Sequence, residues 1–130
     1  MYGAITLEAS DIHLEPQEND SRLRIRLDGI LQDVVFFDHT VYHHLLSRLK
    51  LLSKLKLNIT DKPQDGRFSI GIEDLLIEIR TSSLPAEDGE SVVMRILNPK
   101  SVIALDDLGW RKDMYDVFLK EIQKPNGMII

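Results

Sequence analysis

Alternating apolar and polar residues dominate the first third of the chain. The segment Ser10–Pro16 alternates in this way, and so does Arg22–Phe37, which carries the pair Asp28-Gly29 near its centre. Strict alternation is typical of a half-buried strand, because successive side chains point to opposite faces. Both members of an Asp-Gly pair tolerate the positive φ that a two-residue hairpin turn requires. We therefore predict a single strand followed by a β-hairpin.

The pattern changes to a helical period between Asp38 and Leu57. Apolar side chains recur there at spacings of three and four, which predicts an amphipathic helix with one apolar stripe. The stripe consists of Val41, Leu45, Leu46, Leu49, Leu52 and Leu55. Asp38 or Thr40 can cap the first turn. Basic residues near the carboxyl end, Lys50 among them, complement the helix dipole and are expected on a solvated face.

Two further apolar strands are predicted for Leu75–Ser82 and Ser91–Leu97, joined by the turn-rich segment 84–90. The residues Pro63, Asp65 and Gly66 before them are interpreted as a turn. The order of three strands, a long helix and three more strands indicates an α+β fold. We expect an antiparallel sheet with the long helix packed on one of its faces.

Each of the two later strands carries one arginine among apolar neighbours, Arg80 and Arg95. Alternation puts both arginines on the face opposite to the core rows. The core rows are Leu75, Ile77 and Ile79 in one strand and Val92, Met94 and Ile96 in the other. A buried guanidinium without an anionic partner would be prohibitively costly. The arginines therefore either pair with Glu78, Asp88 or Glu90, or serve an anion from outside the domain.

The last third of the chain differs in character. Asn98–Asp107 has the composition of a linker, and Arg111–Lys124 has a helical period. The apolar face of this second helix consists of Met114, Val117, Phe118 and Ile122. Pro125-Asn126-Gly127 ends the helix, and Met128–Ile130 begins a strand. We expect this tail to be the first helix and strand of another domain, on which its apolar face packs.

Composition narrows the class of protein. A chain of 130 residues with 43% hydrophobic and 28% charged residues is expected to form one soluble domain. The sequence contains no cysteine, which excludes disulfides and thiolate metal sites. No apolar run approaches the length of a bilayer span, and we expect a cytosolic location. The formal net charge of −5 argues against general binding of nucleic acid.

Histidines suggest a metal site, but a simpler explanation is favoured. His39 and His43 are one helical turn apart, so two imidazoles could share a face. No third ligand lies in register with them, and we interpret them as surface residues of the helix.

The row of Arg22, Arg24 and Arg26 could follow a phosphate backbone. It could equally be the polar face of a strand that faces carboxylates such as Glu15 and Asp33, and we favour this second interpretation because aromatic stacking partners are absent. The chain also lacks a GxxxxGK[ST] phosphate loop and any recognisable catalytic set.

Four segments together resemble one family. They are ASDIHLEP at 9–16, RIRLDGIL at 24–31, KPQDGRFSI at 62–70 and EIRTSSLPAEDGESVVMRIL at 78–97, followed by LDDLGW and KPNGMII. In this order they resemble signature segments of the secretion ATPases, the hexameric motors of type II secretion and type IV pilus assembly. The resemblance covers the chain from Ala9 to Ile130.

The resemblance implies a domain organisation. Residues 1–97 would be the PAS-like domain that precedes a RecA-like motor domain, residues 98–112 a linker, and residues 113–130 the truncated start of the motor domain. In this family KPNGMII leads into the phosphate loop that holds ATP and Mg²⁺. The resemblance therefore implies no catalytic residue and no bound metal within this chain, whereas the longer protein would be an ATPase.

The resemblance also assigns residues and partners. In these motors the PAS-like domain closes over ATP and offers arginines to its terminal phosphates, and the matching positions are Arg80 and Arg95. Arg67 of the PQDGR segment is a further candidate, for a contact between domains. Expected partners are the protein's own motor domain, neighbouring subunits of a homohexamer, and platform proteins of the inner membrane, with the protein in the cytoplasm at that membrane. These motifs do not distinguish a secretion motor from a pilus assembly motor.

Two alternatives are kept. A PAS-like sensor would bind a small ligand in its own core and would show a cavity lined by polar side chains. A nucleic-acid-binding module would instead show a contiguous positive surface built from the basic helix end and the arginine row.

Overall fold

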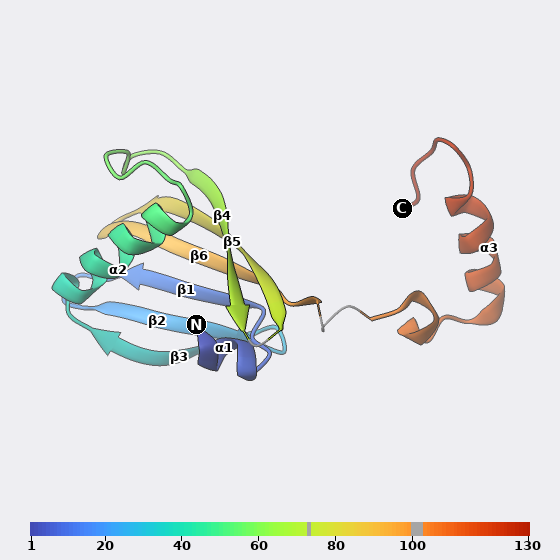
Figure 1. Cartoon of the computed structure of the whole chain (residues 1–130), viewed down its shortest axis with the longest axis horizontal. Coiled ribbons are helices and arrows are strands. Elements are labelled where there is room, and N and C mark those ends of the chain that lie inside the picture. Colours follow the sequence, from blue (N-terminus) through green and yellow to red (C-terminus); the bar gives the residue numbers. More distant parts are fainter. Residues whose placement is uncertain (73, 100–102) are drawn as a thin grey trace.

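Six strands form one antiparallel sheet in the computed structural model, which describes residues 1–72, 74–99 and 103–130. The order across the sheet is β3-β2-β1-β6-β5-β4 (Figure 1). The strands are β1 Asp11–Pro16, β2 Ser21–Leu27, β3 Ile30–Phe37, β4 Gln64–Ile72, β5 Leu75–Ala86 and β6 Gly89–Leu97. The helices are α1 Tyr2–Thr6, α2 His39–Leu52, the 3₁₀ helix η2 Leu105–Leu108 and α3 Lys112–Ile122. The predicted α+β fold is confirmed.

The sheet consists of two three-stranded halves. Strands β1 to β3 follow one another as a meander, α2 crosses one face of the sheet, and β4 to β6 form a second meander (Figure 1). The halves join where the first strand pairs with the last, with Ile12 opposite Met94 and Leu14 opposite Val92. The predicted hairpin turn is also confirmed, since Asp28 and Gly29 have φ of 49° and 81°.

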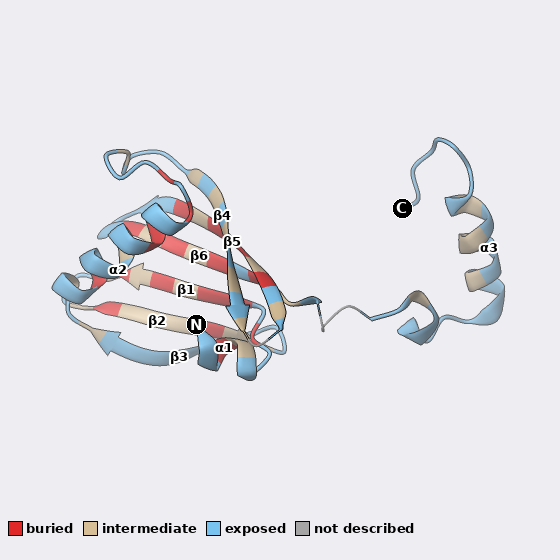
Figure 2. Ribbon diagram, viewed as in Figure 1, coloured by how far each residue is buried: buried red, intermediate tan, exposed pale blue. Residues whose placement is uncertain are grey.

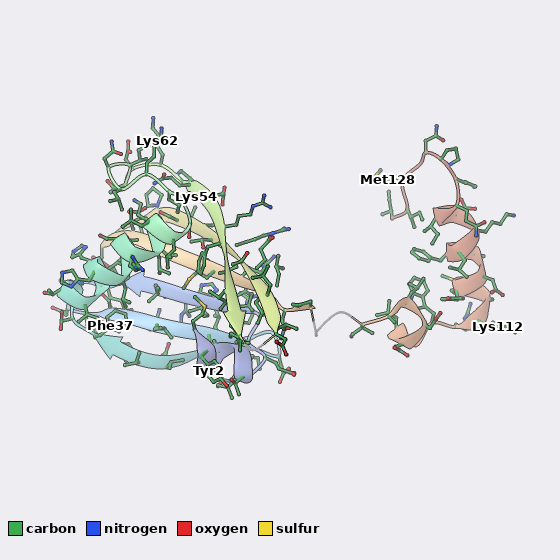
Figure 3. All side chains as sticks on the ribbon, viewed as in Figure 1. Tyr2, Phe37, Lys54, Lys62, Lys112 and Met128 are labelled. Atoms are coloured by element: carbon green, nitrogen blue, oxygen red, sulfur yellow. The ribbon has the colours of Figure 1, made fainter. Side chains whose placement is uncertain are left out.

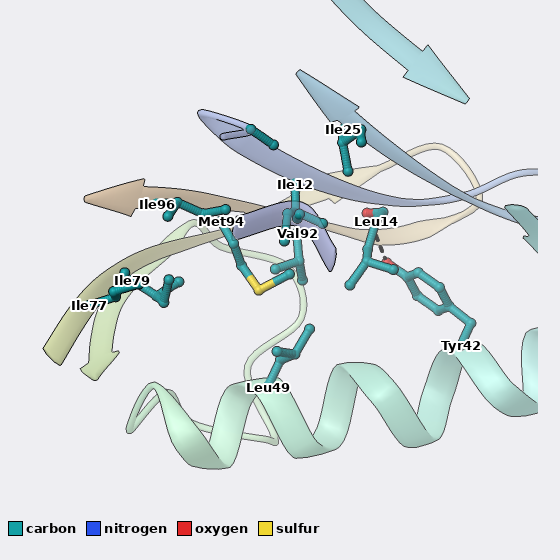
Figure 4. Close-up of a cluster of buried hydrophobic side chains, with 12 residues drawn as sticks. Ile12, Leu14, Ile25, Tyr42, Leu49, Ile77, Ile79, Val92, Met94 and Ile96 are labelled. Atoms are coloured by element: carbon teal, nitrogen blue, oxygen red, sulfur yellow. Dashed lines mark hydrogen bonds between the residues drawn. The ribbon is translucent and has the colours of Figure 1, made fainter. Parts of the chain in front are cut away.

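The hydrophobic core lies between this sheet and α2, as the buried bands in Figure 2 show. Ile77, Ile79 and Val92 are at most 1% exposed, and Met94 and Ile96 are also buried, so the predicted core rows are confirmed. In the close-up of the core, Tyr42 reaches from α2 to the sheet, where its hydroxyl donates to the carbonyl of Leu14 at 3.4 Å (Figure 4).

Helix α2 ends earlier than predicted, at Leu52 instead of Leu57. Lys54 adopts a left-handed φ of 60°. The amide of Leu55 donates to the carbonyl of Lys50 at 2.8 Å, and the amide of Lys54 donates to the carbonyl of Leu51 at 3.1 Å. These two bonds define a Schellman ending, which usually has glycine where this chain has Lys54. The helix end carries no glycine signal in the sequence, so the apolar spacing of Leu55 suggested a longer helix.

The buried face of α2 also differs from the predicted stripe. Tyr42, Leu49 and Lys50 are buried, whereas Val41 and Leu45 are 44% and 39% exposed. The prediction of a solvated Lys50 is wrong. Its ammonium group lies 2.8 Å from each carboxylate oxygen of Glu90 and 2.7 Å from the carbonyl of Ile59.

The buried Lys50–Glu90 ion pair ties three parts of the domain together. Glu90 accepts a further hydrogen bond from the hydroxyl of Ser83 in β5, and its backbone carbonyl accepts one from Tyr42. The helix, the segment after it and the β5–β6 hairpin therefore converge on one ionic group. Such a pair is stable only when its remaining hydrogen-bonding capacity is also satisfied, and here several neighbours satisfy it.

The second predicted helix is confirmed as α3. Its apolar residues Met114, Val117 and Ile122 are between 48% and 58% exposed, and the ring of Phe118 contacts that of Trp110 at 5.1 Å between centroids. The assignment of this helix to a motor domain stays a prediction. Residues 100–102 of the predicted linker lie outside the described residues.

We predict that Lys50→Met destabilises the domain by about 3–5 kcal/mol, because Glu90 is left buried without its cation. The double variant Lys50→Met/Glu90→Leu should lose much less, since no charge then remains buried. Urea unfolding followed by circular dichroism measures both, with Lys56→Met, at an exposed position, as the control. Equal losses in the single and double variants would contradict this account.

Candidate functional site

Three arginines form a row across the second half of the sheet. Arg67 of β4 lies directly opposite Arg80 of β5, and Arg80 lies directly opposite Arg95 of β6. All three are exposed, and they share the face away from α2. The side chains of Arg80 and Arg95 are 67% and 65% exposed, so the predicted outward orientation of both is confirmed.

This arrangement concentrates positive charge. Adjacent strands lie about 4.8 Å apart, and like charges placed directly opposite one another on a sheet repel. Two successive arginine pairs in register are therefore unfavourable unless an anion compensates them.

An open depression of about 500 Å³ adjoins this row. It is lined by Asp65, Gly66, Arg67, Arg80, Thr81 and Ser82.

Carboxylates within the domain compensate this charge only in part. Nε of Arg80 lies 3.3 Å from a carboxylate oxygen of Glu78 in an exposed ion pair. Glu78 was one of the partners that the sequence predicted. Arg95 pairs instead with Asp11 at 3.0 Å, a partner that was not predicted. The predicted pairing of an arginine with Glu90 is wrong, because the side chain of Glu90 is buried on the opposite face of the sheet with Lys50. Arg67 makes no ion pair with any described residue.

The segment before Arg67 fixes the position of β4. The side chain of Gln64 accepts from the amide of Lys56 at 2.9 Å and donates to the carbonyls of Lys56 and Ile59. Asp65 accepts a hydrogen bond from Ser82 of β5 at 2.5 Å. The interpretation of Asp65 and Gly66 as turn residues is wrong, because both lie within β4.

Gly66 is required for a close contact. A Cβ at this position would lie 2.2 Å from the carbonyl oxygen of Ser53 and 2.7 Å from Cδ2 of Leu55. The segment after α2 therefore packs against β4 at a glycine, and the next residue, Arg67, points to the opposite, exposed face. Figure 3 shows Lys54 and Lys62 along the connection that leads from α2 to β4.

The first half of the sheet carries the other arginine row, which is paired as predicted. Arg22 and Arg24 lie 2.9 and 2.5 Å from Glu15, and Arg22 lies 3.7 Å from Asp33. Burial of Glu15 acts to raise its pKa, but hydrogen bonds from Arg24 and Arg22 outweigh that effect and hold the pKa below its ordinary value. The interpretation of this row as a polar face is confirmed.

The other candidate ligand sites have different explanations. Nδ1 of His39 lies 3.1 Å from the hydroxyl of Ser21, and the described residues contain no group of three or more His, Cys, Asp or Glu side chains that could hold a metal. A hollow of about 460 Å³ between α1, α2 and the sheet has a predominantly apolar lining and no polar side chain among its lining residues. This hollow therefore lacks the polar side chains that we expected to line the cavity of a small-ligand sensor.

Comparison with known proteins places the chain in a family. Residues 1–130 match the model of the type II/IV secretion system proteins, and the chain belongs to this family. It is 36% identical to the type IV pilus assembly ATPase PilB of Acinetobacter baylyi, over 100% of this chain and 23% of that protein. It is 37% identical to the type II secretion system ATPase E of Vibrio cholerae, over 98% of this chain and 25% of that protein.

The chain thus spans about a quarter of the length of these relatives. The family membership confirms the resemblance that the ordered segments indicated. Within the described ranges, no helix combines the length and apolar character needed to cross a bilayer.

We predict that Gly66→Ala lowers the free energy of unfolding by about 1–3 kcal/mol, because the added methyl group overlaps the backbone of Ser53. Gly71→Ala is the matched control on the same strand, where a Cβ meets nothing within 4 Å. Chemical denaturation of both variants measures the difference. A loss at Gly71 as large as that at Gly66 would show that the contact with Ser53 does not explain the glycine.

Proposed function

We propose that this chain is the arginine-donating, nucleotide-sensing domain of a hexameric ATPase that powers type II secretion or type IV pilus assembly. The observation that carries the proposal is the pair Arg80 and Arg95, exposed and directly opposite one another in a chain of the secretion family. The names of the relatives, which are pilus assembly and secretion ATPases, support the same assignment.

The chemistry follows from the charge of the site. Guanidinium groups form short, charge-assisted hydrogen bonds to phosphoryl oxygens and neutralise the charge that develops during phosphoryl transfer. This chain has no phosphate loop to cradle ATP and Mg²⁺. In the proposal the motor domain, of which residues 113–130 are the start, holds the nucleotide, and the arginines reach its terminal phosphates when the domains close.

Domain closure would couple nucleotide state to subunit arrangement. Excess positive charge on the sheet favours the closed arrangement while the terminal phosphate is present and weakens that preference after its release. Arg67 extends the row toward the edge strand and would contact an adjoining domain. The other partners in this proposal are neighbouring subunits of a homohexamer and platform proteins of the inner membrane, reached from the cytoplasm.

The two alternatives have less support. The apolar lining of the hollow beneath α2 does not offer the polar groups that would orient a small ligand. Binding of nucleic acid is opposed by the net charge of −5 and by the pairing of Arg22 and Arg24 with Glu15.

We predict that Arg80→Ala in the longer ATPase lowers the turnover number for ATP about a hundredfold or more, because charge compensation at the transferring phosphoryl group is lost. In the 130-residue chain the same change should lower stability by about 1 kcal/mol or less, since its ion pair is exposed. Steady-state ATPase assays and thermal unfolding measure the two effects.

Arg48→Ala is the control, because Arg48 is an exposed arginine of α2, on the other face of the sheet. It should leave turnover within about twofold of the unmodified enzyme, as expected for a surface change far from the site. Unchanged turnover in Arg80→Ala and Arg95→Ala, or an equal loss in Arg48→Ala, would show that the arginine row has no role in ATP hydrolysis.

A further inference from the structure

Asp11 lies between two arginines at the centre of the sheet. In the pairing of β1 it is opposite Arg26 of β2 on one side and opposite Arg95 of β6 on the other. Its Oδ1 accepts from Nε of Arg95 at 3.0 Å, and its Oδ2 accepts from the hydroxyl of Ser10 at 2.9 Å. Nε of Arg26 lies 3.5 Å from Oδ2. Both oxygens of the carboxylate are thus held in place.

The two partners of the Asp11–Arg95 bond differ in burial. The side chain of Asp11 is 5% exposed, whereas that of Arg95 is 65% exposed. The carboxylate of Asp11 is therefore held within the sheet, whereas the side chain of Arg95 extends into solvent. The bond uses Nε of Arg95, so its two Nη groups are not engaged by Asp11.

An anchored Nε restricts where the Nη groups can be. A free arginine side chain has many rotamers and loses that freedom when it binds an anion. A guanidinium already held through Nε keeps four N–H donors on its planar group for a phosphate and has less freedom to lose. The carboxylate also offsets the repulsion between Arg95 and Arg80, which are directly opposite one another.

We propose that Asp11 is a positioning residue for Arg95, which holds the guanidinium in the orientation that receives the terminal phosphate of ATP. This inference rests on the proposed function of Arg95. Asp11 is ionised at neutral pH: burial acts to raise its pKa, but the hydrogen bonds from Arg95 and Ser10 outweigh burial and keep the pKa below its ordinary value. Arg26 compensates the carboxylate from its other side.

Glu15 provides a matched comparison. It lies on the same strand and the same face, and like Asp11 it forms ion pairs with two arginines, here Arg22 and Arg24. Its side chain is 21% exposed, and among the described residues the ion-pair partners of Arg80 and Arg95 are Glu78 and Asp11 instead. Asp11→Asn and Glu15→Gln therefore each remove one paired carboxylate charge from β1, but only the first removes a charge that contacts the proposed phosphate site.

The test is a double-mutant cycle in the longer ATPase. Asp11→Asn should lower the turnover number about tenfold or more, since misplacement of a catalytic group has effects of this size, while Glu15→Gln stays within about twofold. Added to Arg95→Ala, the Asp11→Asn change should cause no further loss, because Asp11 acts through Arg95. A full additional loss in that background, or an equal loss in Glu15→Gln, would overturn the positioning role and indicate a structural one.

The same cycle separates this inference from the proposed function. If Arg95→Ala leaves turnover unchanged, the proposed function of Arg95 fails. If Arg95→Ala lowers turnover but Asp11→Asn does not, only the positioning role fails.

A second measurement does not depend on the folding of any variant. In the NMR spectrum of the unmodified 130-residue chain, the Nε proton of Arg95 should exchange with water at least about tenfold more slowly than that of the exposed Arg48, because only the former is held in a hydrogen bond. Equal exchange rates of the two protons would overturn the inference.

Discussion

The pairing of β1 with β6 is the contact on which both the fold and the site depend. It joins the first and last strands of the sheet and places two three-stranded meanders side by side. On one face this pairing brings Ile12 and Leu14 next to Met94 and Val92, where they form the centre of the core. On the other face it brings Asp11 beside Arg95. Because strand side chains alternate, one register determines both arrangements.

The two faces use charge in opposite ways. On the core face Lys50 of α2 forms a buried ion pair with Glu90 of β6, and Ser83 of β5 and Ile59 of the segment after α2 add hydrogen bonds to it, which fixes these elements relative to one another. On the open face the arginines of β4, β5 and β6 outnumber their carboxylate partners, and their side chains extend into solvent. A satisfied buried pair holds a fold, whereas an undercompensated row in solvent favours an external anion.

Local patterns in the sequence predicted much of this structure. Alternation placed Ile77, Ile79, Val92, Met94 and Ile96 in the core and Arg80 and Arg95 outside it, because strand parity depends on nothing beyond the strand itself. Asp28-Gly29 identified the hairpin turn because the preference of this pair for positive φ is also a local property of the sequence. The order of strands and the long helix was sufficient for the α+β class.

Most of the features that were not predicted depend on contacts between distant segments. The Asp11–Arg95 pair joins residues 84 positions apart and follows only from knowing that β1 lies beside β6. Gly66 resembles a turn residue until the carbonyl of Ser53 is seen against it. Lys50 has the sequence context of a solvated helix end, and its partner Glu90 lies in what looked like a turn. A lysine at the left-handed position after α2 hid the true end of that helix.

The most direct measurement of the central claim is a structure of the assembled ATPase with a non-hydrolysable ATP analogue and Mg²⁺. The account predicts guanidinium nitrogens of Arg80 and Arg95 at about 2.7–2.9 Å from oxygens of the terminal phosphate, with Nε of Arg95 still bonded to Asp11. A terminal phosphate contacted only by other residues, with Arg80 and Arg95 remote from it, would contradict the account.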